Sequence, residues 1–223
     1  MGLTLSDSGG GGDFELVSEG THIARCVRII DLGMQPGGKD FPEPKKTVMF
    51  TFEIPAEMRL INGEERPALI SRRFTASLHE KATLRKFLET WRGRKFTKDE
   101  LAGFELRKVL GQPCMLTVVH SDNAGKHYAN VQAAAAMPRG SMAPAQMETP
   151  VYYEIEQGQD ETYRSFGDKL QATIDIGAGR TPSPVQGASP AVDTQQRNGM
   201  LKSVAEPRAS AAFGGDNIDG VPF

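Results

Sequence analysis

The sequence lacks most of the features that mark secreted, membrane or metal-binding proteins. Its 223 residues include only two cysteines, Cys26 and Cys114, and no cysteine or histidine spacing suited to a zinc ion. No apolar run approaches the roughly 20 residues of a membrane-spanning helix. The chain does not open on a charged and then apolar signal peptide. We therefore expect a cytoplasmic protein with two buried thiols and no cofactor.

Catalytic motifs are missing as well. There is no glycine-rich phosphate loop before a Lys-Ser or Lys-Thr pair, and no nucleophile elbow. The four histidines are scattered without metal-ligand spacing: His22, His79, His120 and His127. These absences predict a protein that is not an enzyme. The alternative is a nuclease whose metal is held by Asp31, Glu53 and Asp122.

The net charge of −2 conceals three segments of different sign. Residues 1–19 contain four acids and no base, and residues 141–223 contain 11 acids and 6 bases. Residues 20–140 contain 20 bases and 13 acids, an excess of +7. A basic segment between acidic ends predicts a core that binds a polyanion. A charged surface exposed only to solvent is the alternative.

A flexible lead and five strands are predicted from the first 140 residues. The glycine run that ends at Asp13 predicts the flexible lead, over residues 1–19. Alternating apolar and polar residues then predict strands over residues 22–32, 45–54, 68–76, 112–120 and 126–135. The alternation slips by one residue near Val27 and Arg28, which predicts a β-bulge in the first strand.

The best-defined helix is predicted between the third and fourth strands. Its apolar face repeats at i, i+3, i+4 and i+7: Leu84, Phe87, Leu88 and Trp91. Ser77 and Glu80 stand in capping-box spacing, so we expect the helix to begin at Ser77. Gly93 is expected to end it in a left-handed conformation. A second capping box, from Thr97 to Glu100, predicts a short helix after it.

Three strands, a helix and two strands thus follow one another within residues 20–140. A five-stranded Greek-key barrel of the OB type has this order, with its helix between strands three and four. The first three strands have no crossover helices between them, which excludes an alternating α/β sheet. We therefore predict an all-β, OB-type barrel with one or two helices.

The remaining chain divides into two parts by composition. Residues 141–176 carry Phe166, Leu170 and Ile174 at helical spacing, and we expect them to form an extension that packs on the core. Residues 177–223 are rich in Gly, Ala, Ser, Pro and Gln, which predicts a disordered linker. The linker ends in an acidic tip whose candidate partner-binding residues are Asp216, Ile218, Asp219, Pro222 and Phe223.

Several of these segments resemble single-stranded DNA-binding proteins. Segments 71–78 (SRRFTASL) and 84–97 (LRKFLETWRGRKFT) are similar to OB-fold proteins of this kind from bacteriophage replication modules, a likeness that spans roughly residues 20–175. The tip, ending in Val221-Pro222-Phe223, is similar to that of the bacterial proteins but lacks their dense acidic run. The resemblance implies a protein of the host cytoplasm that coats and protects single-stranded DNA in phage replication and recombination. Its tip would recruit replication or recombination proteins.

Binding a single DNA strand requires cations along the phosphates and aromatic faces on which bases stack. In an OB barrel the groove crosses strands two and three, between the loops that join strands 1–2 and 4–5. These parts and the helix end carry the candidate DNA-binding residues: Lys39, Lys45, Lys46, Arg72, Arg73, Phe74, Arg92, Arg94, Lys95, Lys126 and Tyr128. Tyr128 is the favoured stacking residue. Thr47 and Met49 are expected to share the groove face with Lys45.

Some candidates have a second interpretation. Phe74 belongs either to the core or to the stacking surface, whereas Trp91 is expected in the core. Arg72 and Arg73 point to opposite faces of their strand, so only one of them faces the groove. The cations that follow the helix alternatively complement its dipole alone: Arg92, Arg94 and Lys95. An adaptor that binds only protein is a third functional class, and homo-oligomerisation is left open.

Overall fold

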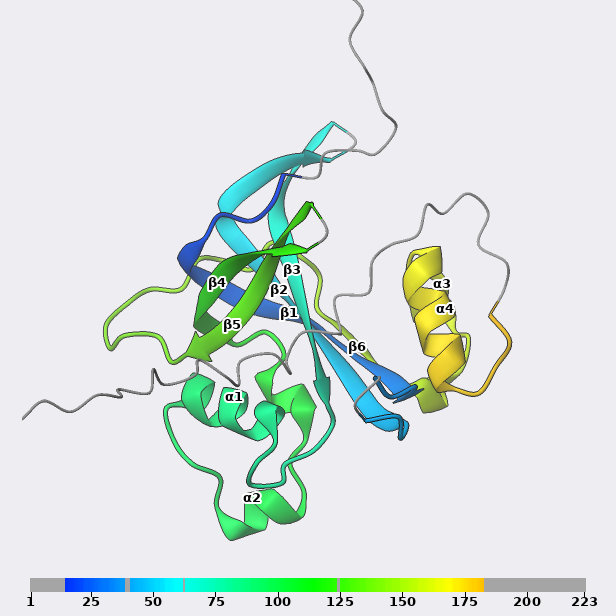
Figure 1. Ribbon diagram of the computed structural model, residues 1–223. Coiled ribbons are helices and arrows are strands. Elements are labelled where there is room, and N and C mark those ends of the chain that lie inside the picture. The colour runs from blue at the N-terminus through cyan, green and yellow to red at the C-terminus, as the bar shows by residue number, and fades with distance from the viewer. Residues whose placement is uncertain (1–14, 39–40, 62, 124, 183–223) are drawn as a thin grey trace, which may run out of the picture. The chain divides into compact units, whose positions relative to one another are not determined.

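The sheet is built around β1, which pairs with three other strands (Figure 1). The computed structural model describes residues 15–38, 41–61, 63–123 and 125–182, all within the compact unit Met1–Ser189. Its strands are β1 Gly20–Gln35, β2 Lys45–Ile61, β3 Glu64–Thr75, β4 Pro113–Asn123, β5 Lys126–Ala135 and β6 Val151–Tyr153. Its helices are α1 Thr83–Arg92, α2 Lys98–Ala102, α3 Glu161–Arg164 and α4 Asp168–Gly177, with short 3-10 turns at η1 Leu106–Val109 and η2 Ile155–Gln157.

The strands form a curled, antiparallel half-barrel in the order β3-β2-β1-β4-β5. Strand β6 adds to β1 in parallel. In the described part of the chain, the edge strands β3 and β5 share no ladder. Arg72 bridges them instead, because its Nη1 donates to the carbonyl of Gln132 at 2.5 Å. The prediction of a mostly-β fold is therefore confirmed. The predicted bulge is also confirmed, because the β1–β2 register shifts between Cys26 and Arg28.

The interior of the half-barrel is filled by the predicted apolar face of β2 and the apolar face of α1. Phe50 and Phe52 are fully buried, and the ring of Phe52 lies 5.6 Å from that of Trp91. The indole of Trp91 donates to the carbonyl of Pro113 at 2.9 Å, which satisfies its one polar group. Phe74 is buried here as well and is thus a core residue. Cys26 and Cys114 are free and buried, as predicted.

The expected start of the main helix is wrong by about one and a half turns. The hydroxyl of Ser77 accepts from the N–H of His79 at 3.2 Å, within a turn. The helix begins at Thr83, and its N-cap Ala82 has no side-chain hydrogen bond. Its end is as predicted, because Gly93 adopts the left-handed conformation with φ 65°. The second capping box is also present.

The extension places more helix in the protein than the one or two helices expected. The described chain has four α-helices, and α3 and α4 both lie between residues 161 and 177. Asp160 starts α3 by accepting from the N–H of Tyr163 at 2.8 Å. Side chains of the extension and of β1 and β2 form a second core: Ile30, Leu32, Met49, Tyr153, Tyr163, Phe166 and Ile174. The face of β1 and β2 that points away from the half-barrel interior is thus covered.

This cover corrects the expectation for the outer face of β2. Thr47 and Met49 were expected to line the groove, but both are buried. Glu53, farther along the same face, is also fully buried. Its carboxylate accepts from the backbone N–H groups of Met147 and Glu148, the latter at 2.7 Å. Of the three residues expected on the groove face, Lys45 alone is exposed.

Candidate nucleic-acid interface

The exposed end of the β1–β2 pair carries an aromatic ring beside a cation. Lys45 Nζ lies 4.8 Å from the centroid of the Phe41 ring, and Phe41 is 69% exposed. A backbone bridge holds the loop, because the N–H of Phe41 donates to the carbonyl of Gly38 at 3.1 Å. A Cβ at Gly37 would lie 2.0 Å from the carbonyl oxygen of Phe41, so the tight path requires glycine there. The loop thus presents a ring and a cation to solvent.

Lys46, the next residue, lines a hollow of about 500 Å³ between β2, η1 and β6. We call it the Tyr152 hollow. On its wall, the guanidinium of Arg107 lies 4.2 Å from the centroid of the Tyr152 ring. Burial, followed by the hydrogen bond to Glu154, raises the pKa of Tyr152 to about 12, so its hydroxyl stays protonated. The exposed Arg107 and the half-buried Tyr152 form a second stacked pair.

The positive charge of Lys46 is balanced by a neighbouring carboxylate. Its Nζ lies 3.0 Å from an Oδ of Asp31, and this hydrogen bond raises the pKa of Lys46. The charges of Glu154 and Glu156 add to the effect. Among the described residues at this end, Lys45 and Arg107 are exposed cations that can meet a phosphate.

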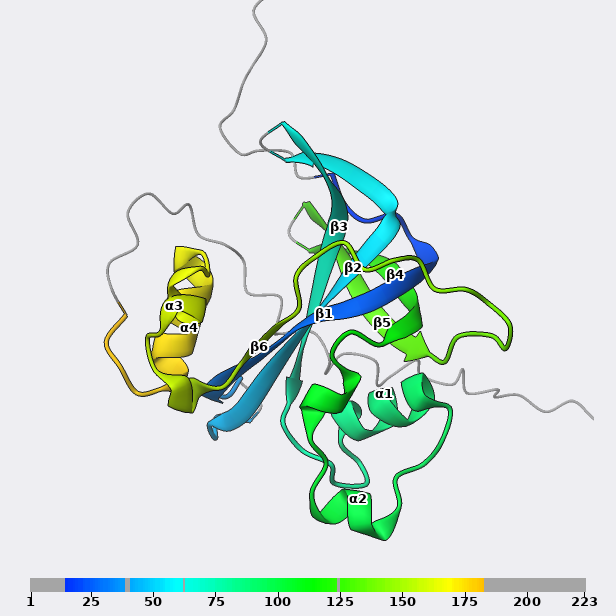
Figure 2. The same cartoon turned by 180° about the vertical axis from the view of Figure 1, so that it is seen from behind.

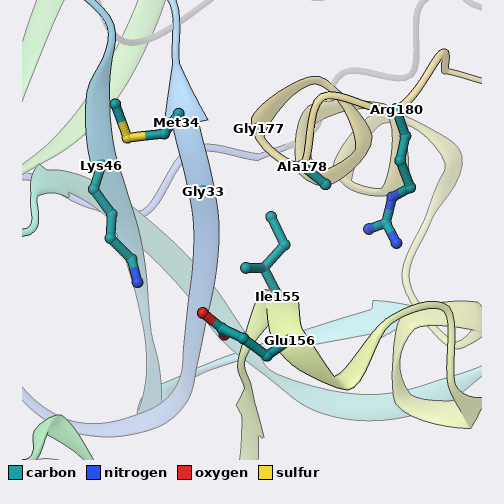
Figure 3. Close-up of a pocket in the computed structure, with 8 residues that line it drawn as sticks. All are labelled: Gly33, Met34, Lys46, Ile155, Glu156, Gly177, Ala178 and Arg180. Carbon is teal, nitrogen blue, oxygen red and sulfur yellow. The ribbon is translucent and has the colours of Figure 1, made fainter.

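A second hollow, of about 450 Å³, lies between the β1–β2 end and the end of α4 (Figure 3). Met34 and Lys46 stand on one side, and Arg180 stands on the other. Arg180 pairs with the buried Asp175 at 3.0 Å, so this cation already has a structural partner. Glu156 lines the same space. The two hollows thus share Lys46, and the cationic groups of this second one are balanced by acids.

The predicted residues on β3 have different surroundings. Arg72 stacks over the buried ring of Phe74, with 4.7 Å between the guanidinium carbon and the ring centroid. It closes the β3–β5 seam, and burial lowers its pKa. Arg73 pairs in register with Met49 and is half-buried on the outer side. Of the two arginines, Arg73 is thus the one on the face where the groove was predicted.

The cations after α1 are tied to one carboxylate. Arg92 and Arg94 both pair with Glu100, and Arg92 also lies over the ring of Phe96 at 4.5 Å. Lys95 is exposed. The helix end therefore has a structural ion-pair cluster in place of a row of free charges.

Acid should break the ion pairs of Glu100 with Arg92 and Arg94, because it protonates the Glu100 carboxylate. Hydrogen bonds from Arg94 and from the N–H of Thr97 hold the pKa of the Glu100 carboxyl at about 2, below its ordinary 4.5. A depressed carboxyl pKa contributes stability above the unfolded-state pKa, and that contribution is lost as the pH falls toward 2. We expect the amide resonances of Thr97 and Glu100 to shift together with a midpoint near pH 2 in an NMR titration of the folded protein. A Glu100→Gln variant should lack this transition, and its persistence would assign the titration to another group.

Lys126 and Tyr128 belong to the β4–β5 hairpin, at the opposite end of β1 from the Phe41 loop (Figures 1 and 2). Lys126 is exposed and Tyr128 is half-buried. The register requires this separation: Gly20 at the start of β1 pairs with Val118 near the hairpin, and Gln35 at its end pairs with Lys45. Lys45 and Lys46 thus lie at one end of β1 and Lys126 and Tyr128 at the other, with the β2 face between them partly covered.

The remaining predictions concern acids and the chain ends. Asp31 pairs with Lys46, Glu53 binds the 147–148 backbone, and Asp122 lies 2.5 Å from His127 at the hairpin. Across the described ranges, no group of three His, Cys, Asp or Glu side chains is placed to hold a metal ion. Lys39 and the tip residues 216–223 lie outside the described residues.

Sequence reasoning missed Phe41, Arg107 and Tyr152. For Phe41 a signal was present. It is a lone aromatic residue in a Gly/Pro-rich loop, between Gly37-Gly38 and Pro42, and it belongs to no alternating apolar pattern that would bury it in a strand. For Arg107 and Tyr152 no local signal exists. They meet only because β6 pairs with β1.

Comparison with protein-family models and with curated protein sequences finds no match for this chain. In the described part of the chain, no helix has the length and apolar character needed to cross a membrane.

Proposed function

We propose that this chain binds single-stranded DNA without sequence preference, through an OB-type Greek-key barrel. The observation that carries the proposal is the pairing of exposed cations with aromatic rings, Lys45 with Phe41 and Arg107 with Tyr152, at one end of the half-barrel. Single-strand binders need this combination, because bases stack on rings while cations follow the phosphates. The strand order and the position of α1 between β3 and β4 in the chain support the OB assignment.

In this proposal the DNA crosses the β1–β2 end. A base stacks on Phe41, and a neighbouring base lies against the Arg107–Tyr152 pair at the Tyr152 hollow. Lys45 and Arg107 contact phosphates, and the +7 excess of residues 20–140 attracts the strand from a distance. The chain would act in phage replication or recombination as a coating protein without catalytic activity. Its tip, residues 216–223, would recruit partner proteins.

Binding of labelled oligo-dT to the full chain, followed by fluorescence anisotropy, tests this proposal. The logarithm of the affinity should fall against the logarithm of salt with a slope of about −0.7 per phosphate neutralised. The double variant Phe41→Ala, Lys45→Ala should lose about 5- to 140-fold in affinity, the value of one stacked base. The matched pair Lys126→Ala, Tyr128→Ala, at the opposite end, should lose much less.

Four results would contradict the proposal in different ways. The reverse order of the two double variants would move the interface to the β4–β5 hairpin. A preference for duplex DNA would exclude single-strand binding. Magnesium-dependent cleavage of the oligonucleotide would indicate a nuclease, and absence of binding would favour an adaptor.

A further inference from the structure

More than half of the positive excess of residues 20–140 comes from one short segment. Residues 79–112, between β3 and β4, contain nine bases and five acids, an excess of +4. Because residues 20–140 have 20 bases and 13 acids, the rest of that range contributes only +3. The segment includes α1, α2 and η1, and Figures 1 and 2 both show α1 between the sheet and α2. The charge is thus concentrated in the helical part that covers one end of the half-barrel.

Three lysines of this segment have no acidic partner. Lys81, Lys86 and Lys98 are exposed, and none of them forms an ion pair with another residue that the structure describes. Lys86 lies on the side of α1 opposite its buried residues, and Lys98 is the first residue of α2, which buries none of its side chains. The arginine next to Lys86 differs, because Arg85 pairs with Glu89 at 3.1 Å. We call the three lysines the lysine surface.

The same segment presents no fully exposed aromatic ring. Phe87, Trp91 and Phe96 are buried, and Phe104 is half-buried against Phe96, with 4.9 Å between the ring centroids. Bases stack on accessible rings, whereas phosphates need only cations. The lysine surface therefore suits a sugar-phosphate backbone and differs from the Phe41 loop, where a ring and a cation lie together.

Apolar contacts are missing from this surface as well. Every large apolar side chain that is exposed in the described chain lies outside residues 79–112. A protein partner or a membrane would bury apolar area at the centre of its contact. Cations without rings or apolar side chains thus favour a nucleic-acid backbone among the anionic partners.

The segment leads directly into the Tyr152 hollow. Phe104, Leu106 and Arg107 line that hollow, and Arg107 is one of the cations assigned to the DNA. Lys98 precedes Phe104 by six residues, a stretch of chain that spans at most about 20 Å. A strand that leaves the hollow on this side therefore meets α2 next.

We propose that the lysine surface holds the phosphates of the single strand that flanks the bases stacked at the Phe41 loop and the Tyr152 hollow. The inference rests on the proposed function and extends its site. The flanking nucleotides add affinity through the release of counterions, without base contacts. One chain then covers more nucleotides than its rings can stack, as a coating protein requires.

The salt dependence of binding to strands of two lengths tests the lysine surface. Labelled oligo-dT of about 4 and about 16 nucleotides brackets the site sizes of OB folds, and fluorescence anisotropy measures the affinity of the full chain for each. The triple variant Lys81→Gln, Lys86→Gln, Lys98→Gln should bind the short strand as the wild type does. On the long strand its salt slope should be shallower by about 2, which is 0.7 for each of three lysines. Raising the salt from about 50 to about 200 mM should then weaken the wild type about 20-fold more than the variant.

A control variant removes the same charge elsewhere. Lys126, Arg164 and Lys169 are exposed and lie outside the segment, so their replacement by Gln should leave the long-strand slope close to that of the wild type. Equal slopes for the wild type and the Lys81, Lys86, Lys98 variant on the long strand would overturn the lysine surface.

Three other results would also contradict it, each in a different way. An equal change of slope in the control variant would mean that net charge alone is responsible. A lysine-dependent gain from a duplex arm beside the short strand, with none from the longer single strand, would assign the surface to duplex DNA. Failure of the wild type to bind even the short strand would overturn the proposed function itself, and the lysine surface with it.

Discussion

Replacing Phe50 by alanine is expected to lower the free energy of unfolding by about 3–5 kcal/mol. Phe50 is fully buried, and its ring meets that of Phe74 edge to face at 5.6 Å. Phe74 in turn lies 4.8 Å from the ring of Phe87 on α1. The substitution therefore opens a cavity at the contact between β2, β3 and the helix, where the surrounding side chains have little freedom to collapse.

Urea unfolding followed by the fluorescence of Trp91 measures this effect, because the single tryptophan is buried in the same core. Phe41→Ala is the matched control, since it removes the same ring from an exposed site. Its effect on stability should stay within about 0.5 kcal/mol. Equal losses for the two variants would mean that Phe50 does not contribute through burial.

Replacing Glu53 by alanine is expected to cost about 3 kcal/mol or more. The fully buried carboxylate accepts from the N–H groups of Met147 and Glu148, and it lies 3.9 Å from the Nε of Arg25. Its removal leaves two part-buried N–H donors and a partly buried cation without this partner. Arg25 keeps its bonds to the carbonyls of Gly111 and Pro144, which limits the loss.

The effect of Glu53→Ala should also be local. Amide hydrogen exchange at Met147 and Glu148 should accelerate more than exchange in the half-barrel interior, because these two N–H groups lose their acceptor. Glu80→Ala, which removes an exposed carboxylate from a turn, is the control and should change neither property. Unchanged exchange at both amides would show that the segment is held without Glu53.

Local patterns predicted the interior of the fold well because it is built from neighbouring strands and one helix. Alternation placed Phe50 and Phe52 in the core, and the slip near Val27 located the bulge. The same alternation failed on the other side of β2, where every residue from Thr47 to Ile54 is buried. An alternating pattern predicts one buried and one solvent-exposed face of a strand. No residue of β2 reveals that a segment about 100 positions later covers its second face.

The candidate site was predictable only where a single loop forms it. Lys45 and Lys46 were found because they begin a strand next to a Gly/Pro-rich loop. The ion pair between Lys46 and Asp31 could not be predicted, because it depends on the register between β1 and β2, which the bulges shift. The Arg107–Tyr152 pair depends on a parallel strand three residues long, for which periodicity carries almost no signal.

The position of β6 has a consequence for how the chain is made. β1 begins at Gly20, yet its last pairing partner ends at Tyr153, so the sheet is incomplete until most of the described chain has left the ribosome. Until then Ile30, Leu32 and Met49 form an apolar surface without its cover. Synthesis adds residues far more slowly than strands pair, so this surface meets the cytosol for seconds in every round of translation. We therefore expect the yield of this protein to depend on protection of the nascent chain as well as on its final stability.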